Sequence, residues 1–362
     1  MTRRTPLALA ALAALALAAC SGGAEAVTSV ATTRPAATPT KAKAKPTPAA
    51  TPKPRRTPTP ASGSASTLNL AFAGADLAVV NFETAITGRG TPEPKAFHFR
   101  TRPKALMTLQ KAGVDAVSLA NNHAVDYGPL GLEDTLAARA ASPIPVIGIG
   151  RNAEDAFAPA TFTLKGVRVA VIASTQVNDL TVTKFPATDT RAGVAGNLTN
   201  TRLVAAVRKA AASYDVVVVF LHWGTDYTSC PDGAQERTAR DLEAAGADVI
   251  VGGHAHRVQA AGWFGRSYVG YGLGNFVWHI RAEPDRRSGV LNVSIDIPRA
   301  KARGAATGAA RMTTTSLVTA ADWTPLHVDS DGVPRQPSAG TASALYADWQ
   351  ARRACSNLKA QP

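Results

Sequence analysis

The sequence predicts an α/β layered domain. Short apolar runs alternate with helical patterns between residues 76 and 252, and strand-like runs without helices follow Gly262. Alternating strands and helices are typical of layered α/β domains. Polar side chains follow several of the apolar runs, at the strand ends where such domains place their ligands. With 362 residues, 45% of them hydrophobic, the chain is long enough for one large domain with a full core.

The expected elements follow from periodicity and from glycine and proline signals. Strands are expected at 76–81, 115–120, 145–148, 167–174, 215–222 and 248–252. Helices are expected at 103–112, 131–141, 201–212 and 235–245; Gly113 and Gly246 end the first and last of these. Strands at 267–271, 275–280, 289–297 and 311–318 predict a second, largely antiparallel sheet. Residues 68–74 read as an opening strand, 300–308 as a loop and 342–358 as a terminal helix.

The residue types at the N-terminus follow one another in the order that is typical of an export signal. Arg3 and Arg4 precede an apolar run over 6–19, which is too short to span about 30 Å of hydrocarbon. The run ends in two small residues before Cys20, an arrangement that resembles a bacterial lipobox. We therefore expect a signal peptide over 1–19, lipidation of Cys20 and an extracytoplasmic, membrane-anchored protein. The alternative is an ordinary signal peptide with an incidental cysteine.

Residues 20–66 are expected to form a disordered linker. They are rich in Ala, Thr and Lys and contain eight prolines, so they cannot offset the entropy of ordering. Residues 1–66 carry nine Lys and Arg against one acid, so most of the net charge of +13 lies in this tail. The tail could bind an anionic lipid surface or wall polymer, or simply be solvated. No basic cluster marks the rest of the chain, so the sequence argues against a nucleic-acid partner.

The folded part is divided into a main domain over 67–299 and C-terminal strands with a tail over 300–362 that complete it. Three cysteines are too few for a disulfide-dense scaffold or a four-cysteine zinc site. If Cys20 carries a lipid, Cys230 and Cys355 form an even pair in an exported protein. That pair suggests one disulfide, with two unpaired buried thiols as the alternative.

Polar residues that suit metal binding follow four of the predicted strands. The sharpest signal is Gly252-Gly253-His254-Ala255-His256, because two histidines at i and i+2 of an extended segment point to the same side. Imidazoles bind zinc, iron, nickel or copper, and added oxygen ligands suit a hydrolytic site with two metals. A single histidine is more often structural than a ligand, so the argument rests on the whole set. The set is Glu83, Asn121, Asn122, His123, His222, His254 and His256.

Five segments in this order resemble the CapA family of capsule, or poly-γ-glutamate, synthesis proteins. The segments are 76–84 (DLAVVNFET), 119–128 (LANNHAVDYG), 221–224 (LHWG), 246–256 (GADVIVGGHAH) and 271–276 (YGLGNF). The resemblance implies a four-layer α/β/β/α sandwich of the calcineurin-like metallophosphoesterase type. The Gly-Asp that usually ends the family's opening strand is missing here, so the fold is expected to lack one early element.

The resemblance also implies roles for the polar residues. Glu83 would be the bridging acid, and Asn122, His222, His254 and His256 would be further ligands of Mn, Fe or Zn. His123 would protonate the leaving group. Asn121, Asn275 and Trp223 would line the pocket, although Trp223 equally fits a packing role. The missing Asp predicts weak cation binding or none.

Three functions are compatible with this sequence. The first is a CapA-like surface lipoprotein in synthesis, attachment or processing of an anionic polymer such as poly-γ-glutamate, together with polymer synthase components. The second is a metal-dependent phosphoesterase acting on an envelope substrate. The third is a non-catalytic scaffold that keeps the fold, because fold alone does not determine chemistry.

Overall fold

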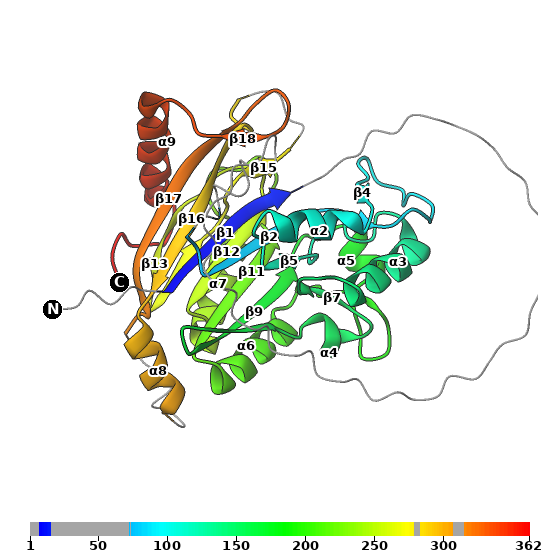
Figure 1. Ribbon diagram of the computed structural model, residues 1–362, viewed down its shortest axis with the longest axis horizontal. Coiled ribbons are helices and arrows are strands. Elements are labelled where there is room, and N and C mark those ends of the chain that lie inside the picture. Colours follow the sequence, from blue (N-terminus) through cyan, green and yellow to red (C-terminus); the bar gives the residue numbers. More distant parts are fainter. Residues whose placement is uncertain (1–6, 16–71, 73, 279–282, 307–314) are drawn as a thin grey trace, which may run out of the picture.

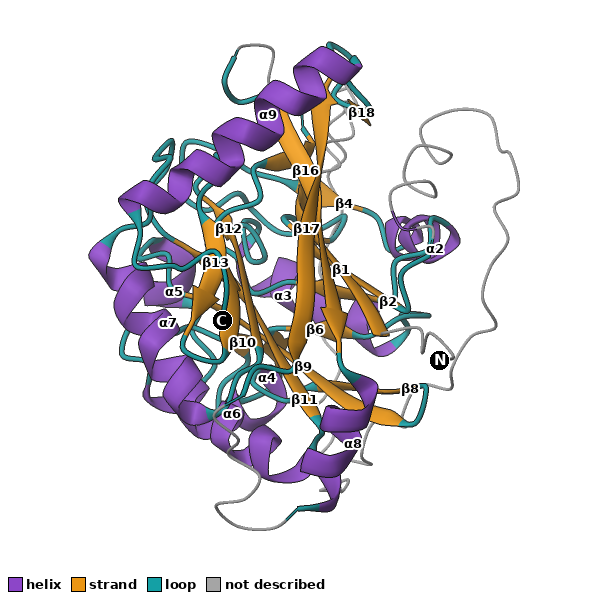
Figure 2. Cartoon of the chain, turned by 90° about the vertical axis from the view of Figure 1, so that its left-hand side faces the viewer, coloured by secondary structure: helices purple, strands orange, loops and turns teal. Residues whose placement is uncertain are grey.

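The computed structural model describes residues 7–15, 72, 74–278, 283–306 and 315–362. Within this part of the chain, two large β-sheets lie face to face, and helices cover their outer faces (Figures 1 and 2). The first sheet has the strand order β18-β17-β16-β1-β2-β5-β6, with β15 beside β1. The second sheet has the order β13-β14-β12-β11-β9-β8.

The first sheet is mixed. Its strands are β1 (Leu7–Leu15), β2 (Leu77–Phe82), β5 (Ala116–Ser118), β6 (Val146–Ile147), β15 (Asn275–Val277), β16 (Arg287–Ile295), β17 (Val318–Val328) and β18 (Pro334–Arg335). Strand β1 runs parallel to β2 and antiparallel to β16. The strands from β16 to β18 are antiparallel to one another and extend this sheet. They do not form the separate antiparallel sheet that the sequence predicted.

The second sheet is parallel at its centre. Its strands are β8 (Ala160–Leu164), β9 (Val167–Thr175), β11 (Val216–Trp223), β12 (Val249–His254), β13 (Ala261–Phe264) and β14 (Ser267–Gly270). Strands β9, β11, β12 and β14 are parallel neighbours, and β8 and β13 add antiparallel edges. Two small sheets pair β3 (Ala85–Ile86) with β4 (Arg100–Thr101) and β7 (Ile149–Gly150) with β10 (Gly193–Val194).

Strand β11 shows how the sandwich is packed. Val216, Val218 and Phe220 belong to the apolar cluster that also contains Val79 and Leu291 of the first sheet. The alternate residues face the other way. Val217, Val219 and Leu221 belong to a second cluster with Leu203 of α6 and Leu242 of α7. Because successive strand residues point to opposite faces, one strand contacts the other sheet and the helix layer. This arrangement confirms the predicted α/β/β/α fold class.

The helices are α2 (Lys104–Lys111), α3 (Gly128–Ala140), α4 (Ala153–Ala156), α5 (Leu180–Lys184), α6 (Thr201–Ser213), α7 (Gly233–Ala245), α8 (Ile297–Ala305) and α9 (Ala339–Ala351), followed by the 3₁₀ helix η2 (Arg352–Cys355). Helix α7 begins with an Asp232–Gln235 capping box and ends at Gly246, whose φ is 111°. Helix α9 lies along β17, where Trp349 stacks on Trp323 (Figure 1). None of the helices in the described ranges has the length and apolarity needed to cross a bilayer.

The position beside β2 differs from the sequence prediction. Residues 68–74 were expected to form the opening strand, but Phe72 is helical and Gly74 lies in a turn. The strand between β2 and β16 is instead Leu7–Leu15, part of the segment predicted as a signal peptide (Figure 1). Only two residues separate Gly74 from β2, whereas a parallel neighbour needs a long crossover connection. Leu7–Leu15 satisfies that requirement. The signal-peptide assignment itself stays a prediction.

Two expectations near the C-terminus are wrong. Residues 300–308 were read as a loop, but α8 spans Ile297–Ala305, with the Asp296 side chain accepting from the Arg299 N–H. Its Arg303 forms a buried ion pair with Asp248. The strand expected at 311–318 begins only at Val318, and residues 311–314 lie outside the described part.

Candidate metal-binding site

The polar residues that follow β2, β5, β11 and β12 meet at one edge of the sandwich. Two contacts join the sheets there. The Asn81 amide nitrogen lies 3.3 Å from His222 Nδ1, and Asn122 Oδ1 lies 2.8 Å from His222 Nε2. Asn81 and Asn122 come from the first sheet and His222 from the second. The sequence prediction that these strand ends converge is therefore reproduced in three dimensions.

Glu83 lies at the centre of this group and is fully buried. Its Oε2 accepts a hydrogen bond from Asn81 Nδ2 at 3.0 Å. Its Oε1 has no hydrogen-bond partner among the described residues, yet it lies 3.7 Å from His222 Nε2 and 3.9 Å from His123 Nε2. A buried carboxylate oxygen without a donor is costly, so the position is suited to a cation.

The contacts of His222 define its tautomer. Asn81 Nδ2 donates to Nδ1, so the proton is assigned to Nε2, which donates to Asn122 Oδ1. A cation at Nε2 would take the place of that proton. Asn122 Oδ1 at 2.8 Å and Glu83 Oε1 at 3.7 Å are oxygen atoms that could hold such a cation together with Nε2.

His254 and His256 approach the same place from the end of β12. The His254 ring lies 4.8 Å from the His222 ring, and the His256 ring lies 6.2 Å from that of His254. Asn275 Oδ1 holds His256 Nδ1 at 2.7 Å. Asn275 therefore orients a predicted ligand. His254 Nδ1 is buried and has no hydrogen-bond partner among the described residues.

Burial dominates the electrostatics of the site. Together with the nearby Asp226 it raises the pKa of Glu83 to about 8, while the hydrogen bond from Asn81 acts in the opposite direction. It lowers the pKa of His254 to about 4 and that of His222 well below its ordinary value. Without a cation, the centre of the site is therefore uncharged at pH 7.

His123 belongs to a second polar network. Its Nδ1 lies 2.7 Å from Asp126 Oδ2, and Asp126 also accepts from Lys95 Nζ at 2.8 Å. Lys95 additionally contacts Asp179 at 3.1 Å and the Asn122 carbonyl. Burial lowers the pKa of His123, and the hydrogen bond to Asp126 opposes that change. Asp126 thus orients the ring whose Nε2 faces Glu83.

The other predicted residues have supporting places. Asn121 is buried, donates to Asn81 Oδ1 and the Phe82 carbonyl, and accepts from the His123 N–H. Trp223 points away from the cluster into the helix-facing core, where its Nε1 donates to the Tyr271 carbonyl. Trp223 therefore packs in the core, which was the alternative to lining the pocket. Cys20 lies outside the described residues.

Sequence reasoning missed three contributors to the site. Asn81 contacts Glu83, Asn121 and His222. Asp126 holds His123, and Asp226 Oδ1 lies 3.4 Å from His254 Nε2. Asn81 and Asp126 lie within the segments that carried the family resemblance, so a search for groups that orient the ligands could have found them.

The site offers a buried carboxyl oxygen that could contact a cation, but the described part of the chain does not offer the usual group of three charged or imidazole ligands. Among the described residues, no group of three or more His, Cys, Asp and Glu side chains is arranged to hold a metal ion. The tightest group is Glu83, His222 and Asn122, in which the third donor is an amide oxygen. The unpartnered Glu83 Oε1 makes this group the one best suited to a divalent cation.

The two face-to-face sheets with helices outside them, and the histidines, asparagines and buried acid at their strand ends, define the protein as an α/β/β/α sandwich with a polar site at one edge. Within that class, the family described as bacterial capsule synthesis protein PGA_cap matches residues 27–279 of this chain. The match covers more than half of the chain and includes every residue of the cluster. The chain therefore belongs to the PGA_cap family.

Curated relatives carry related descriptions. The chain is 30% identical over 210 residues to "PGA biosynthesis protein CapA" of Bacillus subtilis, covering 57% of this chain and 54% of that protein. It is 33% identical over 188 residues to "Capsule biosynthesis protein CapA" of Bacillus anthracis, covering 51% and 45%. A "Probable polyglutamine synthesis accessory protein" of Mycobacterium tuberculosis is 27% identical, covering 56% and 55%. The chain matches about half of the length of these relatives.

Solved structures are more distant. A hypothetical protein from Thermus thermophilus is 14% identical with a TM-score of 0.43, covering 73% of this chain and 92% of that one. The structure described as "GAP50 the anchor in the inner membrane complex of Plasmodium" is 9% identical with a TM-score of 0.33, covering 78% and 89%.

Proposed function

We propose that this protein acts in the synthesis, attachment or processing of an anionic envelope polymer of the poly-γ-glutamate type. The observation that carries the proposal is the polar cluster around Glu83, which lies within the part of the chain matched by the PGA_cap family. The names of the relatives support the polymer class. Components of a polymer synthase are the expected protein partners.

We propose further that the cluster binds a divalent cation, Mn, Fe or Zn, through Glu83, Asn122 and His222, with His254 and His256 beside them. Such an ion would supply positive charge for an anionic substrate group. The chain's own residues would do the rest. Asn81 fixes Glu83 and His222, while Asp126 fixes His123 with its Nε2 toward the reacting side. In the cation-free protein His123 is neutral at pH 7, so a proton-donating role requires charging on substrate binding.

The proposal can be tested with purified full-length protein and poly-γ-glutamate of defined length. We expect the polymer to bind the protein, or to change in length, in the presence of Mn²⁺. A His254→Ala variant should lose the effect, whereas Asn197→Ala, which removes a buried asparagine elsewhere, should keep it. Neither binding nor a change in polymer length with the wild-type protein would contradict the polymer assignment.

A second candidate is a metal-dependent phosphoesterase. It is favoured by the donor chemistry of Glu83, Asn122 and His222, which mixes oxygen and nitrogen as hydrolytic metal sites do. A panel of phosphomonoesters and phosphodiesters with Mn²⁺, Fe²⁺ or Zn²⁺ tests it, with His123→Ala as the variant that should lose turnover. Polymer binding without any turnover would instead support a scaffold that keeps the fold.

We propose that the protein is extracytoplasmic and anchored through Cys20. The support is that basic residues, an apolar run and two small residues precede this cysteine in that order. The same segment supplies β1. Cleavage before Cys20 would separate β1 from the rest of the chain, so the N-terminal mass of the protein from the membrane fraction is decisive. A mass beginning at a lipidated Cys20 supports the anchor, and a mass that includes residues 1–19 contradicts it.

A further inference from the structure

The loop between β11 and α7 brings a carboxylate to the histidine cluster. Asp226 lies three residues after β11, and its Oδ1 is 3.4 Å from His254 Nε2. The next residue, Tyr227, donates its backbone N–H to the Ala255 carbonyl at 2.8 Å, between the two histidines of the other loop. Its ring stacks on His256 with the centroids 5.9 Å apart. Asp226 is thus held against the Gly-His-Ala-His segment by contacts on its neighbour.

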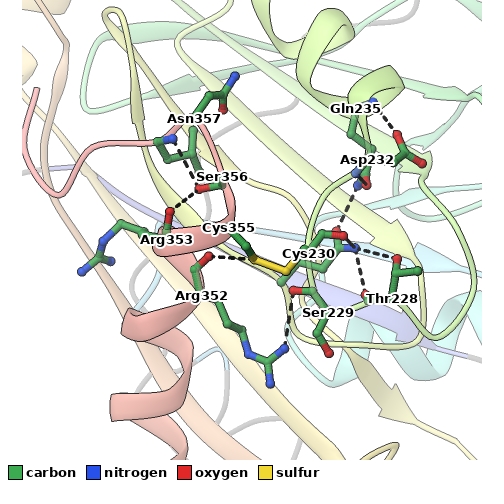
Figure 3. The surroundings of a disulfide bond; sticks show 12 residues. Thr228, Ser229, Cys230, Asp232, Gln235, Arg352, Arg353, Cys355, Ser356 and Asn357 are labelled. Atoms are coloured by element: carbon green, nitrogen blue, oxygen red, sulfur yellow. Dashed lines mark hydrogen bonds between the residues drawn. A yellow bond between two sulfur atoms is a disulfide. The ribbon is translucent and has the colours of Figure 1, made fainter.

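The far end of this loop is fixed as well. The disulfide between Cys230 and Cys355 joins it to the C-terminal segment after α9, as Figure 3 shows. Gln259 Nε2 donates to the carbonyls of Thr228 and Cys230 at 3.0 and 3.2 Å. Asp232 then begins α7 as its N-cap. A loop held at this many points keeps Asp226 in place at little further entropic cost.

Backbone strain is concentrated around the same carboxylate. His254, His256 and Tyr227 have φ values of 98°, 51° and 62°, a region that residues with a Cβ rarely adopt. Such a conformation persists only where the surroundings enforce it. Here the two facing loops are strained together, which is typical of sites that aim side chains at a ligand.

We propose that Asp226 is a cation ligand in this protein. It would share a divalent transition-metal ion with His254, next to the group formed by Glu83, Asn122 and His222. The inference rests on the cation binding proposed above. The 3.4 Å between the carboxylate oxygen and the imidazole nitrogen is a separation that two ligands of one ion can have.

The exposure of Asp226 is consistent with this role. Its side chain is 53% exposed, whereas those of Glu83 and His222 are almost fully buried. An ion held partly by Asp226 would therefore be reachable from solvent on that side. Such an open side is what distinguishes catalytic or substrate-binding metal sites from closed structural ones. The alternative is a contact between the Asp226 carboxylate and the neutral His254 ring that has no function in cation binding.

The test compares Mn²⁺ binding to full-length wild-type, Asp226→Asn and Asp226→Glu proteins by calorimetry and by electron paramagnetic resonance. Asn keeps the shape of the side chain and removes its charge. The matched control is Tyr227→Phe, which changes the neighbouring residue of the same loop without removing a donor near His254. We expect Asp226→Asn to lose one bound Mn²⁺ or to bind it at least about tenfold more weakly, and Asp226→Glu to recover part of the affinity.

The outcomes separate this inference from the proposed function. If His222→Ala loses Mn²⁺ and Asp226→Asn binds it like the wild type, only the role of Asp226 is wrong. If the wild-type protein binds no Mn²⁺, the proposed cation binding fails and this inference fails with it. Melting temperatures of the cation-free proteins provide the last check. A lower value for Asp226→Asn together with unchanged Mn²⁺ affinity would mean that the residue only stabilises the loop, and would overturn its assignment as a ligand.

Discussion

Glu83 Oε1 and His222 Nε2 lie 3.7 Å apart and join the ends of two strands that belong to different sheets. Both side chains are buried, and Glu83 Oε1 has no hydrogen-bond partner among the described residues. The sandwich is therefore closed at this edge by a carboxyl group that burial keeps protonated at pH 7 when no cation is bound. This relationship makes the stability of the cation-free protein depend on pH.

Burial raises the pKa of Glu83 to about 8 in the folded protein, against 4.5 for an ordinary glutamate carboxyl. A raised folded-state pKa stabilises the fold below the unfolded-state value, and this contribution is lost as pH rises toward 8. We expect the cation-free protein to lose up to about 5 kcal/mol between pH 4.5 and 8 from this group. Urea unfolding with a chelator at several pH values measures the effect. Glu83→Gln should flatten the curve, and equal slopes for both proteins would contradict the assignment.

Asn81 is expected to act as a positioning residue, because its amide contacts both Glu83 and His222. Asn81→Ala should lower Mn²⁺ affinity by about 10- to 100-fold, the usual effect of losing a group that orients a ligand. It should also cost about 1–3 kcal/mol by leaving buried partners unsatisfied. Asn197→Ala is the matched control, since it removes a buried asparagine whose amide nitrogen donates to Asn200. Equal cation affinity in the two variants would show that Asn81 only stabilises the fold.

Asp126 is expected to be the residue on which the His123 network depends. It is fully buried and accepts from His123, from Lys95 and from the Phe99 N–H at 2.7–2.8 Å. Asp126→Asn should reduce the free energy of unfolding by about 3 kcal/mol, because Lys95 loses its closest acidic partner. Adding Lys95→Met should restore part of the loss. Strict additivity of the two single changes in urea unfolding would mean that they do not act as one network.

The Cys230–Cys355 disulfide joins positions 125 residues apart and closes the loop that carries Asp226. Replacing both cysteines by serine should lower the free energy of unfolding by about 2–4 kcal/mol. If the loop positions Asp226 as a ligand, Mn²⁺ affinity should fall as well. The wild-type protein under reducing conditions serves as the comparison for both measurements. A loss of stability without any loss of affinity would show that the loop keeps its place without the disulfide.

The sequence was informative where the signal is local. The continuous apolar run of β11 predicted a buried strand, and the alternation of strand and helix patterns predicted a layered α/β domain. The histidines at the ends of β11 and β12 predicted the position of the cluster, whereas the two-sheet sandwich was implied by the family resemblance. Helix boundaries were also close, because Gly113 and Gly246 adopt the positive φ that ends a helix. Such signals are local, so one sequence is enough to read them.

Contacts between distant segments were not predictable in this way. Helix α8 contains small and basic residues that read as a loop, but its Arg303 is buried against Asp248, 55 residues earlier. Asp226 has no local pattern at all, and only the facing loop brings it to His254. In both cases the partner is distant along the chain, so tertiary structure and not a local sequence pattern determines the contact.

Strand β1 is the clearest example, and it leads to the last prediction. Leu7–Leu15 pairs with β2 on one side and β16 on the other, with Ala11 opposite Val79 and Leu291. The strands β2 and β16 are not neighbours in the sheet, so loss of β1 leaves an unpaired edge on each of them. Ala11→Pro removes a backbone donor from the middle of this strand and should cost about 3 kcal/mol or more.

Urea unfolding of the full-length chain measures that cost, with Ala49→Pro in the proline-rich 20–66 segment as the control that should change nothing. The result also bears on export, because cleavage before Cys20 removes the same strand. If Ala11→Pro is destabilising, a cleaved protein must either be less stable than the full chain or fill the position between β2 and β16 with another strand. If Ala11→Pro matches its control, β1 adds nothing to stability, and the chain can lose residues 1–19 and keep the rest of its fold.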